Sequence, residues 1–230
     1  MRMDLVFVDA NVLFSRTLRD WTFLLSAECK RFAVVSSLDC LVETVGNIRE
    51  RNPEAGGGVI SHIHDLIERS LHDVLRDYPG GPIEGVSDEK DWHVIHAATQ
   101  AEAKILVTDN IRDFARVADS LPFDLYTADD LFMLMAHNDP RAVEAVTMRQ
   151  VHYWEDVGKR YAAEDKPAPK KLAQALRDAG AASFAQIIDE TLRKLSGERR
   201  APDAGSLDAA SPVHADPDPD AVAETVPSPA

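Results

Sequence analysis

The chain has 230 residues, of which 45% are hydrophobic and 28% are charged, and its formal net charge is −14 at pH 7. This composition is typical of one globular domain with appendages and excludes a chain too polar to bury a core. The N-terminal residues run into a short apolar stretch that Asp9 interrupts, so we expect neither a signal peptide nor a membrane span, and we expect a cytoplasmic protein.

Apolar runs alternate with helical patterns through the first 140 residues. Short runs rich in Val, Ile, Leu and Phe, with β-branched residues throughout, predict strands, and apolar residues at helical spacing predict the segments between them. This alternation is typical of βαβ units and predicts an α/β fold with a central parallel sheet and helices on both faces. The predicted strands are 5–8, 32–36, 105–108 and 123–126, with a short extended piece at 83–86, and the predicted helices are 12–25, 38–48, 60–75, 88–103, 112–118 and 128–136.

The strand pattern stops after Asn138, and only helical spacing continues beyond it. We therefore predict an α/β domain over residues 1–138 and a helical extension over 139–198, packed on the domain or on a partner. Residues 199–230 contain Pro, Ala, Asp and Ser with almost no large apolar side chain, which is typical of a disordered acidic tail.

Four acidic residues lie at the ends of predicted strands or at the start of the helices beside them: Asp9, Glu43, Asp91 and Asp109. If the strands are parallel neighbours, their carboxyl ends meet at one edge of the sheet, where open α/β folds place their sites. Such carboxylates repel one another when ionised, so they need raised pKa values or a bound cation. Oxygen ligands without a cysteine partner favour Mg²⁺ or Mn²⁺ over zinc.

Each acidic residue also has a structural interpretation. Asp9 could cap the helix that follows its strand, and we expect Asp88 to cap the helix that contains Asp91. Glu43 lies in a mostly apolar stretch, where a surface residue is the default; near the core face a glutamate would need a partner, which favours a ligand role.

Other metal-binding patterns are absent from the sequence. Cys29 and Cys40 lack the spacing of a metal site, and we expect two reduced thiols. His93 and His96 are three residues apart with no glutamate between them, unlike the helical histidine pair of zinc proteases.

Four motifs in order resemble those of the PIN-domain ribonuclease family. They are Phe7-Val8-Asp9-Ala10-Asn11, Glu43 in Leu41-Val42-Glu43-Thr44-Val45, Asp88-Glu89-Lys90-Asp91-Trp92-His93, and Thr108-Asp109-Asn110 with Asp113-Phe114. The resemblance covers roughly residues 3 to 136 and implies a PIN-like three-layer sandwich. The helical extension and the tail lie outside it.

The resemblance also implies a role for each of these residues. Asp9, Glu43, Asp91 and Asp109 would be catalytic and would bind Mg²⁺ or Mn²⁺, with Asp113 as a fifth candidate. Asn11 and Thr108 would orient the carboxylates through hydrogen bonds. The metal would activate a water molecule that attacks a phosphodiester of RNA.

The protein is thus expected to be an endoribonuclease, and the resemblance suggests the toxin of a type II toxin–antitoxin pair, with an antitoxin protein as partner and a homodimer as its assembly. Residues 141–200 hold twelve Lys or Arg against nine Asp or Glu, whereas residues 201–230 hold six acidic residues and no Lys or Arg. The basic excess fits a surface for a phosphate backbone, although a solvated helical face explains it equally well. Candidate RNA contacts on the extension are Arg149, Lys159, Arg160, Lys170 and Lys171.

Two further functions stay open. A PIN-like module could hold RNA or a protein without cutting it. A phosphatase with an aspartate nucleophile also begins with a strand that ends in Asp, but there the second residue beyond is Asp, whereas here it is Asn11.

Overall fold

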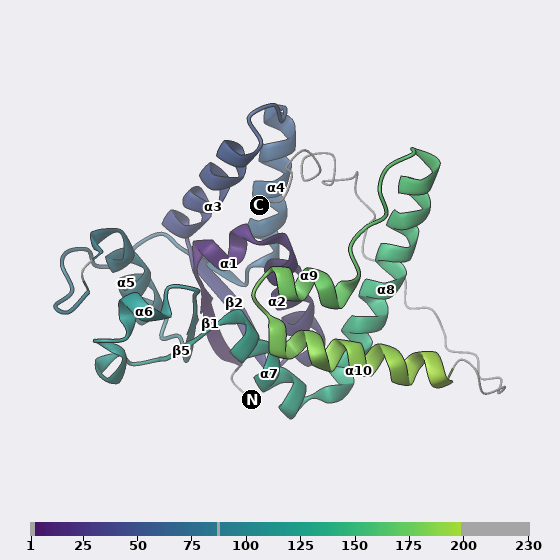
Figure 1. Cartoon of the computed structure of the whole chain (residues 1–230). Helices are drawn as coiled ribbons and strands as arrows, with labels where there is room; N and C mark the ends of the chain where they lie inside the picture. Colours follow the sequence, from purple (N-terminus) through teal and green to yellow (C-terminus); the bar gives the residue numbers. More distant parts are fainter. Residues whose placement is uncertain (1–2, 87, 199–230) are drawn as a thin grey trace.

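The computed structural model of the chain describes residues 3–86 and 88–198 (Figure 1). The tail predicted to be disordered, residues 199–230, lies outside the described residues. The fold is α/β, as predicted, with a central sheet of five parallel strands in the order β3-β2-β1-β4-β5. The strands are β1 (Asp4–Val8), β2 (Phe32–Ser37), β3 (Asp73–Leu75), β4 (Ile105–Val107) and β5 (Asp124–Tyr126).

The register between β1 and β4 determines which residues meet at the carboxyl edge of the sheet. Val8 at the end of β1 pairs with Val107 at the end of β4, so the next residues of both strands, Asp9 and Thr108, leave the sheet side by side. All six residues of β2 are buried, which is why this strand is a continuous apolar and small-residue run rather than an alternating one.

Helices cover both faces of the sheet. Their bounds are α1 (Ala10–Phe14), α2 (Arg16–Cys29), α3 (Leu38–Arg51), α4 (Gly57–Ser70), α5 (Trp92–Gln100), α6 (Ile111–Phe114), α7 (Ala128–Asn138), α8 (Pro140–Ala163), α9 (Leu172–Asp178) and α10 (Ala182–Glu198), with short 3₁₀ helices η1 (Glu89–Asp91) and η2 (Ala118–Ser120). One apolar cluster contains Val6 and Val8 and extends into α2, α7 and α10, whereas the other contains Phe7 and lies against α5. The side chains of successive β1 residues thus point to opposite faces of the sheet, because side chains alternate along a strand.

The prediction of one helix over residues 60–75 was wrong at its C-terminal end. The helix ends at Ser70, and Asp73–Leu75 form β3 at the edge of the sheet. The His72 N–H donates a hydrogen bond of 2.7 Å to the Val34 carbonyl oxygen, which begins the pairing with β2. A long-range backbone contact therefore overrides the helical spacing of Val74 and Leu75.

Three other boundaries differ from the prediction. Residues 83–86 form a turn rather than a strand. The predicted helix 88–103 begins as η1 and becomes α-helical only at Trp92, and the predicted helix 112–118 is the four-residue α6 followed by η2.

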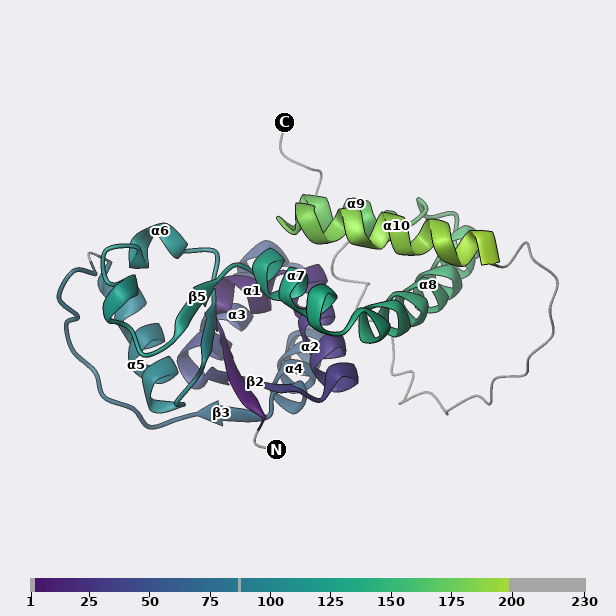
Figure 2. The same cartoon turned by 90° about the horizontal axis from the view of Figure 1, so that it is seen from below.

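The helical extension continues the core of the domain. Phe184 on α10 is fully buried, and its ring centroid lies 5.1 Å from those of both Trp21 on α2 and Phe132 on α7. Figure 2 shows α8, α9 and α10 on the side of the molecule away from α5 and α6. Among the described residues, no helix combines the length and the apolar character that crossing a membrane requires.

Candidate metal centre

Asp9, the first residue after β1, lies at the centre of the site and is only 4% exposed. Its Oδ1 accepts a hydrogen bond from the Ala10 N–H (2.6 Å), and its Oδ2 accepts from Asn11 Nδ2 (2.9 Å) and from Thr108 Oγ1 (2.7 Å). Burial raises the pKa of Asp9, and the hydrogen bonds from Thr108 and Ala10 act in the opposite direction. Asp9 is also the N-cap residue of α1, but the cap explains only one of its three hydrogen bonds.

Asn11 and Thr108 join the start of α1 to the loop after β4. Besides their bonds to Asp9, Asn11 Nδ2 donates to Thr108 Oγ1 (3.1 Å), and Asn11 Oδ1 accepts from the Asp109 N–H (3.2 Å). Thr108 Oγ1 also accepts from the Asn110 N–H (3.0 Å). These bonds fix both the Asp9 carboxylate and the backbone that carries Asp109.

Asp91 is the second buried carboxylate of the site. It lies where η1 passes into α5 and is 8% exposed. Its Oδ1 accepts a long hydrogen bond from Asn110 Nδ2 (3.5 Å), whereas its Oδ2 is buried with no hydrogen-bond partner. Burial, followed by the charges of Asp9, Asp88 and Asp113, raises the pKa of Asp91 to about 6.

The capping role predicted for Asp88 is confirmed. Asp88 Oδ1 accepts a hydrogen bond of 2.9 Å from the Lys90 N–H at the start of η1. The side chain of Asp91 makes no capping hydrogen bond, so its carboxylate is not used to terminate a helix.

Glu43 lies on α3 in the surface position rather than near the core face. Both Glu43 and its neighbour Val42 are exposed, and Val42 is 61% exposed. The apolar stripe of α3 passes instead through Leu41 and Ile48. Even so, partial burial and then the charge of Asp9 raise the pKa of Glu43, which places its carboxylate within electrostatic reach of the site.

Asp109 and Asp113 are both exposed and lie on either side of the start of α6. Burial and then the charge of Asp9 raise the pKa of Asp109. The charge of Asp113 acts on Asp91 instead. The loop after β4 and the first turn of α6 thus each carry one exposed carboxylate close to the buried ones.

No three ligand atoms of the four predicted ligands lie within 4.8 Å of one another. Among the described residues, the three side chains whose ligand atoms all lie within 4.8 Å of one another are His64, Asp65 and Glu68 on α4. That group is already paired, because His64 Nδ1 lies 3.0 Å from Asp65 Oδ1 and Arg76 lies 2.7 Å from Glu68 Oε1. The carboxylates at the strand ends form a wider arrangement around Asp9.

This arrangement suits a divalent cation with a preference for oxygen. The charge of Asp9 raises the pKa of three other carboxylates, and one oxygen of Asp91 is buried without a partner. A cation between them would relieve the repulsion and give that oxygen a partner. Asp9 and Asp91 would hold it, with Glu43, Asp109 or Asp113 completing the oxygen ligands.

The candidate RNA contacts on the extension are spread over α8 and the start of α9. Arg149 lies 3.7 Å from Glu28, Lys159 lies 2.7 Å from Asp156, and Lys170 lies 2.6 Å from Asp178. Arg160 and Lys171 are exposed. Because three of the five are ion-paired with acidic side chains, their attraction for a phosphate backbone is weakened.

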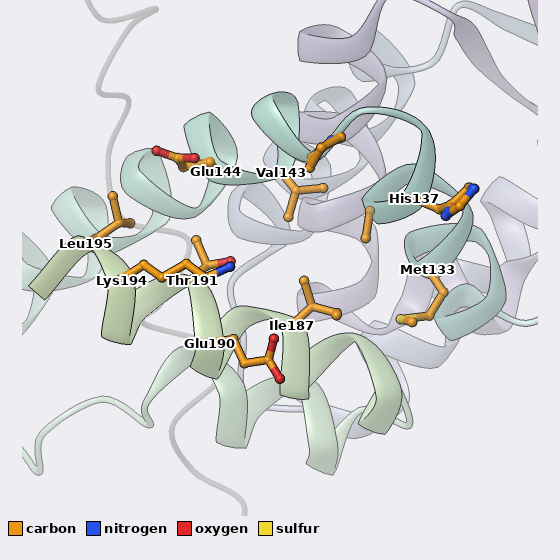
Figure 3. A pocket seen from close by; sticks show the side chains of 11 residues that line it. Met133, His137, Val143, Glu144, Ile187, Glu190, Thr191, Lys194 and Leu195 are labelled. Carbon is orange, nitrogen blue, oxygen red and sulfur yellow. The ribbon is translucent and has the colours of Figure 1, made fainter. Parts of the chain in front are cut away.

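A pocket of about 410 Å³ lies elsewhere, between α7, α8 and α10 (Figure 3). Met133 and Val143 line one side, and Ile187, Glu190 and Lys194 line the other. The strand-end carboxylates do not line this pocket.

Three neighbours of the acidic residues were not assigned to the site from the sequence. His93 lies close enough for its charge to lower the pKa of both Asp9 and Glu43, and its Nδ1 is buried without a partner. Cys40 is fully buried with Sγ 3.9 Å from Asp9 Oδ1, and Asn110 bonds to Asp91. His93 and Asn110 stand beside acidic positions in the sequence, but nothing in the spacing of Cys40 indicates its contact.

Residues 5–112 match the family model of the PIN domain. The searches of curated proteins and of solved structures gave no match. The matched segment contains the central strands of the sheet and Asp9, Glu43, Asp91 and Asp109, and it ends one residue before Asp113. Over residues 5–112, just under half of the chain, the protein is therefore similar to the PIN domain.

Proposed function

We propose that this protein is a metal-dependent endoribonuclease that hydrolyses phosphodiester bonds of RNA with Mg²⁺ or Mn²⁺. The observation that carries the proposal is the match to the PIN domain over residues 5–112, which include Asp9, Glu43, Asp91 and Asp109. Two of these carboxylates, Asp9 and Asp91, are buried, and Asp91 Oδ2 has no hydrogen-bond partner. The four side chains come from four separate segments at the carboxyl edge of the sheet, where a site is expected in such folds.

Different residues of the chain would orient the carboxylates, bind the cation and accept a proton. A bound divalent cation supplies Lewis acidity and lowers the pKa of water. Asn11 and Thr108 hold Asp9 in one orientation, so that a ligand need not order this carboxylate on binding. Asp91 offers its unpartnered oxygen, and the exposed carboxylate of Glu43 can accept a proton from water near the scissile phosphate.

Cleavage of single-stranded and structured RNA by the purified full-length protein tests the proposal. We expect cutting in Mg²⁺ or Mn²⁺, loss of cutting in EDTA, and a fall of at least about 100-fold for Asp9→Asn. Asp65→Asn is the matched control, because it changes an acid of the other close group, on α4, and it should cut as the wild type does. Cutting that persists in EDTA or in Asp9→Asn would contradict the proposed site.

We also propose the finer role of a toxin neutralised by an antitoxin protein, which rests on the resemblance of the motifs. Expression of the wild type in a bacterial host should then arrest growth, and Asp9→Asn should not. Growth arrest by both proteins would show that cleavage at this site is not its cause.

A binding module that does not cut is the second candidate. It is favoured by the spacing of the strand-end carboxylates, of which no three described ligand atoms come within 4.8 Å of one another. Binding of RNA without cleavage in any metal, and no metal uptake by calorimetry, would support it. The phosphatase has less support, because the Asn11 side chain forms hydrogen bonds with Asp9, Thr108 and the Asp109 backbone. An amide also cannot act as the general acid that the second aspartate of such a phosphatase provides.

A further inference from the structure

An exposed tyrosine on α8 is held in place by an arginine and a tryptophan. Arg16, the first residue of α2, donates a hydrogen bond of 3.1 Å to the Tyr153 hydroxyl. The Arg16 guanidinium lies 5.1 Å from the centre of the Trp154 ring, and the rings of Tyr153 and Trp154 meet edge to face at 5.3 Å. Trp154 is itself fixed by its Nε1 bond of 3.0 Å to Gln150. The Tyr153 ring is thus ordered before any ligand arrives.

The exposure of Tyr153 is not explained by helix packing. The cation–π contact between Arg16 and Trp154 joins α2 to α8. This contact does not require the neighbouring ring of Tyr153 to be exposed. Tyr153 is nevertheless 41% exposed, one of only three large hydrophobic side chains in the described part of the chain that are exposed. An ordered and exposed aromatic ring is the feature on which unpaired bases stack.

A second arginine–aromatic pair joins the C-terminal ends of α1 and α3. The Arg51 guanidinium, at the end of α3, lies 5.6 Å from the centre of the Phe14 ring, at the end of α1. Only Ser15 separates Phe14 of this pair from Arg16 of the first pair along the chain. We call Phe14, Arg16, Arg51, Tyr153 and Trp154 the arginine–aromatic strip.

The strip begins close to the carboxylates. Phe14 is five residues beyond Asp9 along α1, and Arg51 is eight residues beyond Glu43 along α3. At the helical rise of 1.5 Å per residue these separations are about 8 Å and about 12 Å. A strand of substrate that reaches the acidic site would therefore pass the strip within a few nucleotides.

Charge favours RNA as the occupant. The acidic site repels a phosphate backbone until a metal is bound, and the chain as a whole carries −14. Arg16 and Arg51 supply positive charge beside the site, and a guanidinium can both pair with phosphate and stack on a base. Asp20 lies 3.5 Å from Arg16 Nε and reduces part of that charge, so stacking rather than charge should dominate at Tyr153.

We propose that the arginine–aromatic strip binds an unpaired segment of the RNA substrate beside the cleavage site, with one base stacked on Tyr153. This inference rests on the proposed nuclease function for its substrate class. A paired base has no free face to stack, so the strip would contact unpaired nucleotides only.

Binding can be measured apart from cleavage. Full-length Asp9→Asn protein is titrated into a fluorescein-labelled single-stranded RNA of about twelve nucleotides, and anisotropy gives the affinity. Adding Tyr153→Ala should weaken binding by roughly 5- to 100-fold, the effect of losing one stacked base. Tyr153→Phe keeps the ring and should stay within about twofold. Met3→Ala is the matched control, because Met3 is also 41% exposed but precedes β1 at the opposite edge of the sheet.

Arg51→Ala gives a second test that does not touch α8, and it should weaken the same binding by several-fold. Affinity that is unchanged in both Tyr153→Ala and Arg51→Ala, or absence of RNA binding by the parent protein, would overturn the inference. If the wild type cuts RNA and these variants cut and bind equally well, the strip is refuted while the nuclease function stands. If Tyr153 governs binding but the wild type never cuts, the strip stands and the nuclease function fails.

Discussion

Replacing Asp91 by Asn should stabilise the metal-free protein while abolishing its metal response. In the folded chain the pKa of Asp91 is raised from 3.8 to about 6, first by burial and then by the charges of Asp9, Asp88 and Asp113. The folded state therefore binds the Asp91 proton more tightly than the unfolded state does. When pH rises from 3.8 through about 6 this proton is lost, and the free energy of unfolding of the wild type falls. Asparagine has nearly the same shape and no charge, and it removes this loss.

The magnitude follows from the shift. About two pKa units at 1.36 kcal/mol each give an upper bound of about 3 kcal/mol at pH 7.5. Asp88 and Asp113 are exposed, so solvent and salt screen part of their repulsion. We therefore expect Asp91→Asn to raise the free energy of unfolding by about 1 to 2 kcal/mol.

Urea unfolding in EDTA at pH 7.5 and at pH 4 measures this effect. The gain should be present at pH 7.5 and should shrink toward zero at pH 4, because Asp91 is then protonated in the folded wild type. Asp119→Asn, an exposed substitution on η2, is the control and should change nothing. In Mn²⁺ the wild type should have the larger free energy of unfolding, since the ion stabilises the wild type more than Asp91→Asn. The reasoning is refuted if Asp91→Asn is destabilised at pH 7.5, or if its gain is the same at both pH values.

Three further predictions address the surroundings of the site. Thr108→Val removes a hydrogen bond of 2.7 Å to Asp9, and Mn²⁺ affinity by calorimetry should fall by about 10- to 100-fold; an unchanged affinity would mean that Asp9 is oriented by other groups. Phe184→Ala should cost about 3 to 5 kcal/mol in urea unfolding, and a cost near zero would place α10 outside the core. Replacing Lys170 and Lys171 by Glu should weaken RNA binding at low salt without unfolding the protein, and equal affinity would remove α9 from the RNA surface.

The part of the fold that the sequence predicts well is the part buried on both faces. β1 and β2 are covered by helices on each side, so their residues form continuous apolar runs that no surface helix would have. Parallel pairing then places the ends of β1 and β4 together, and this alone brings Asp9 next to Thr108. The centre of the site was therefore predictable from pattern and topology.

The edge of the sheet was not predictable in this way. β3 has three residues, and Val74 and Leu75 follow Ile67 and Leu71 at spacings that suit a helix equally well. Only pairing with β2, a contact between segments about forty residues apart, decides in favour of a strand. Local spacing cannot carry that information.

The position of Glu43 on α3 could not be decided from the sequence. Apolar residues on both sides of Glu43 are compatible with several apolar stripes on the same helix. Packing selects the stripe through Leu41 and Ile48 and leaves Val42 and Glu43 exposed. Exposure is what a carboxylate that must meet a substrate requires.

The choice between Asp109 and Asp113 depends on where α6 begins, which spacing alone leaves open. The helix begins at Ile111, so Asp109 stays on the loop, with its N–H bound to Asn11, while Asp113 lies in the first turn. Asp109 is then coupled to Asp9, and Asp113 to Asp91. The bond from the Asp109 N–H to Asn11 holds the loop before α6 against the start of α1, and it links the first motif of the chain to the last.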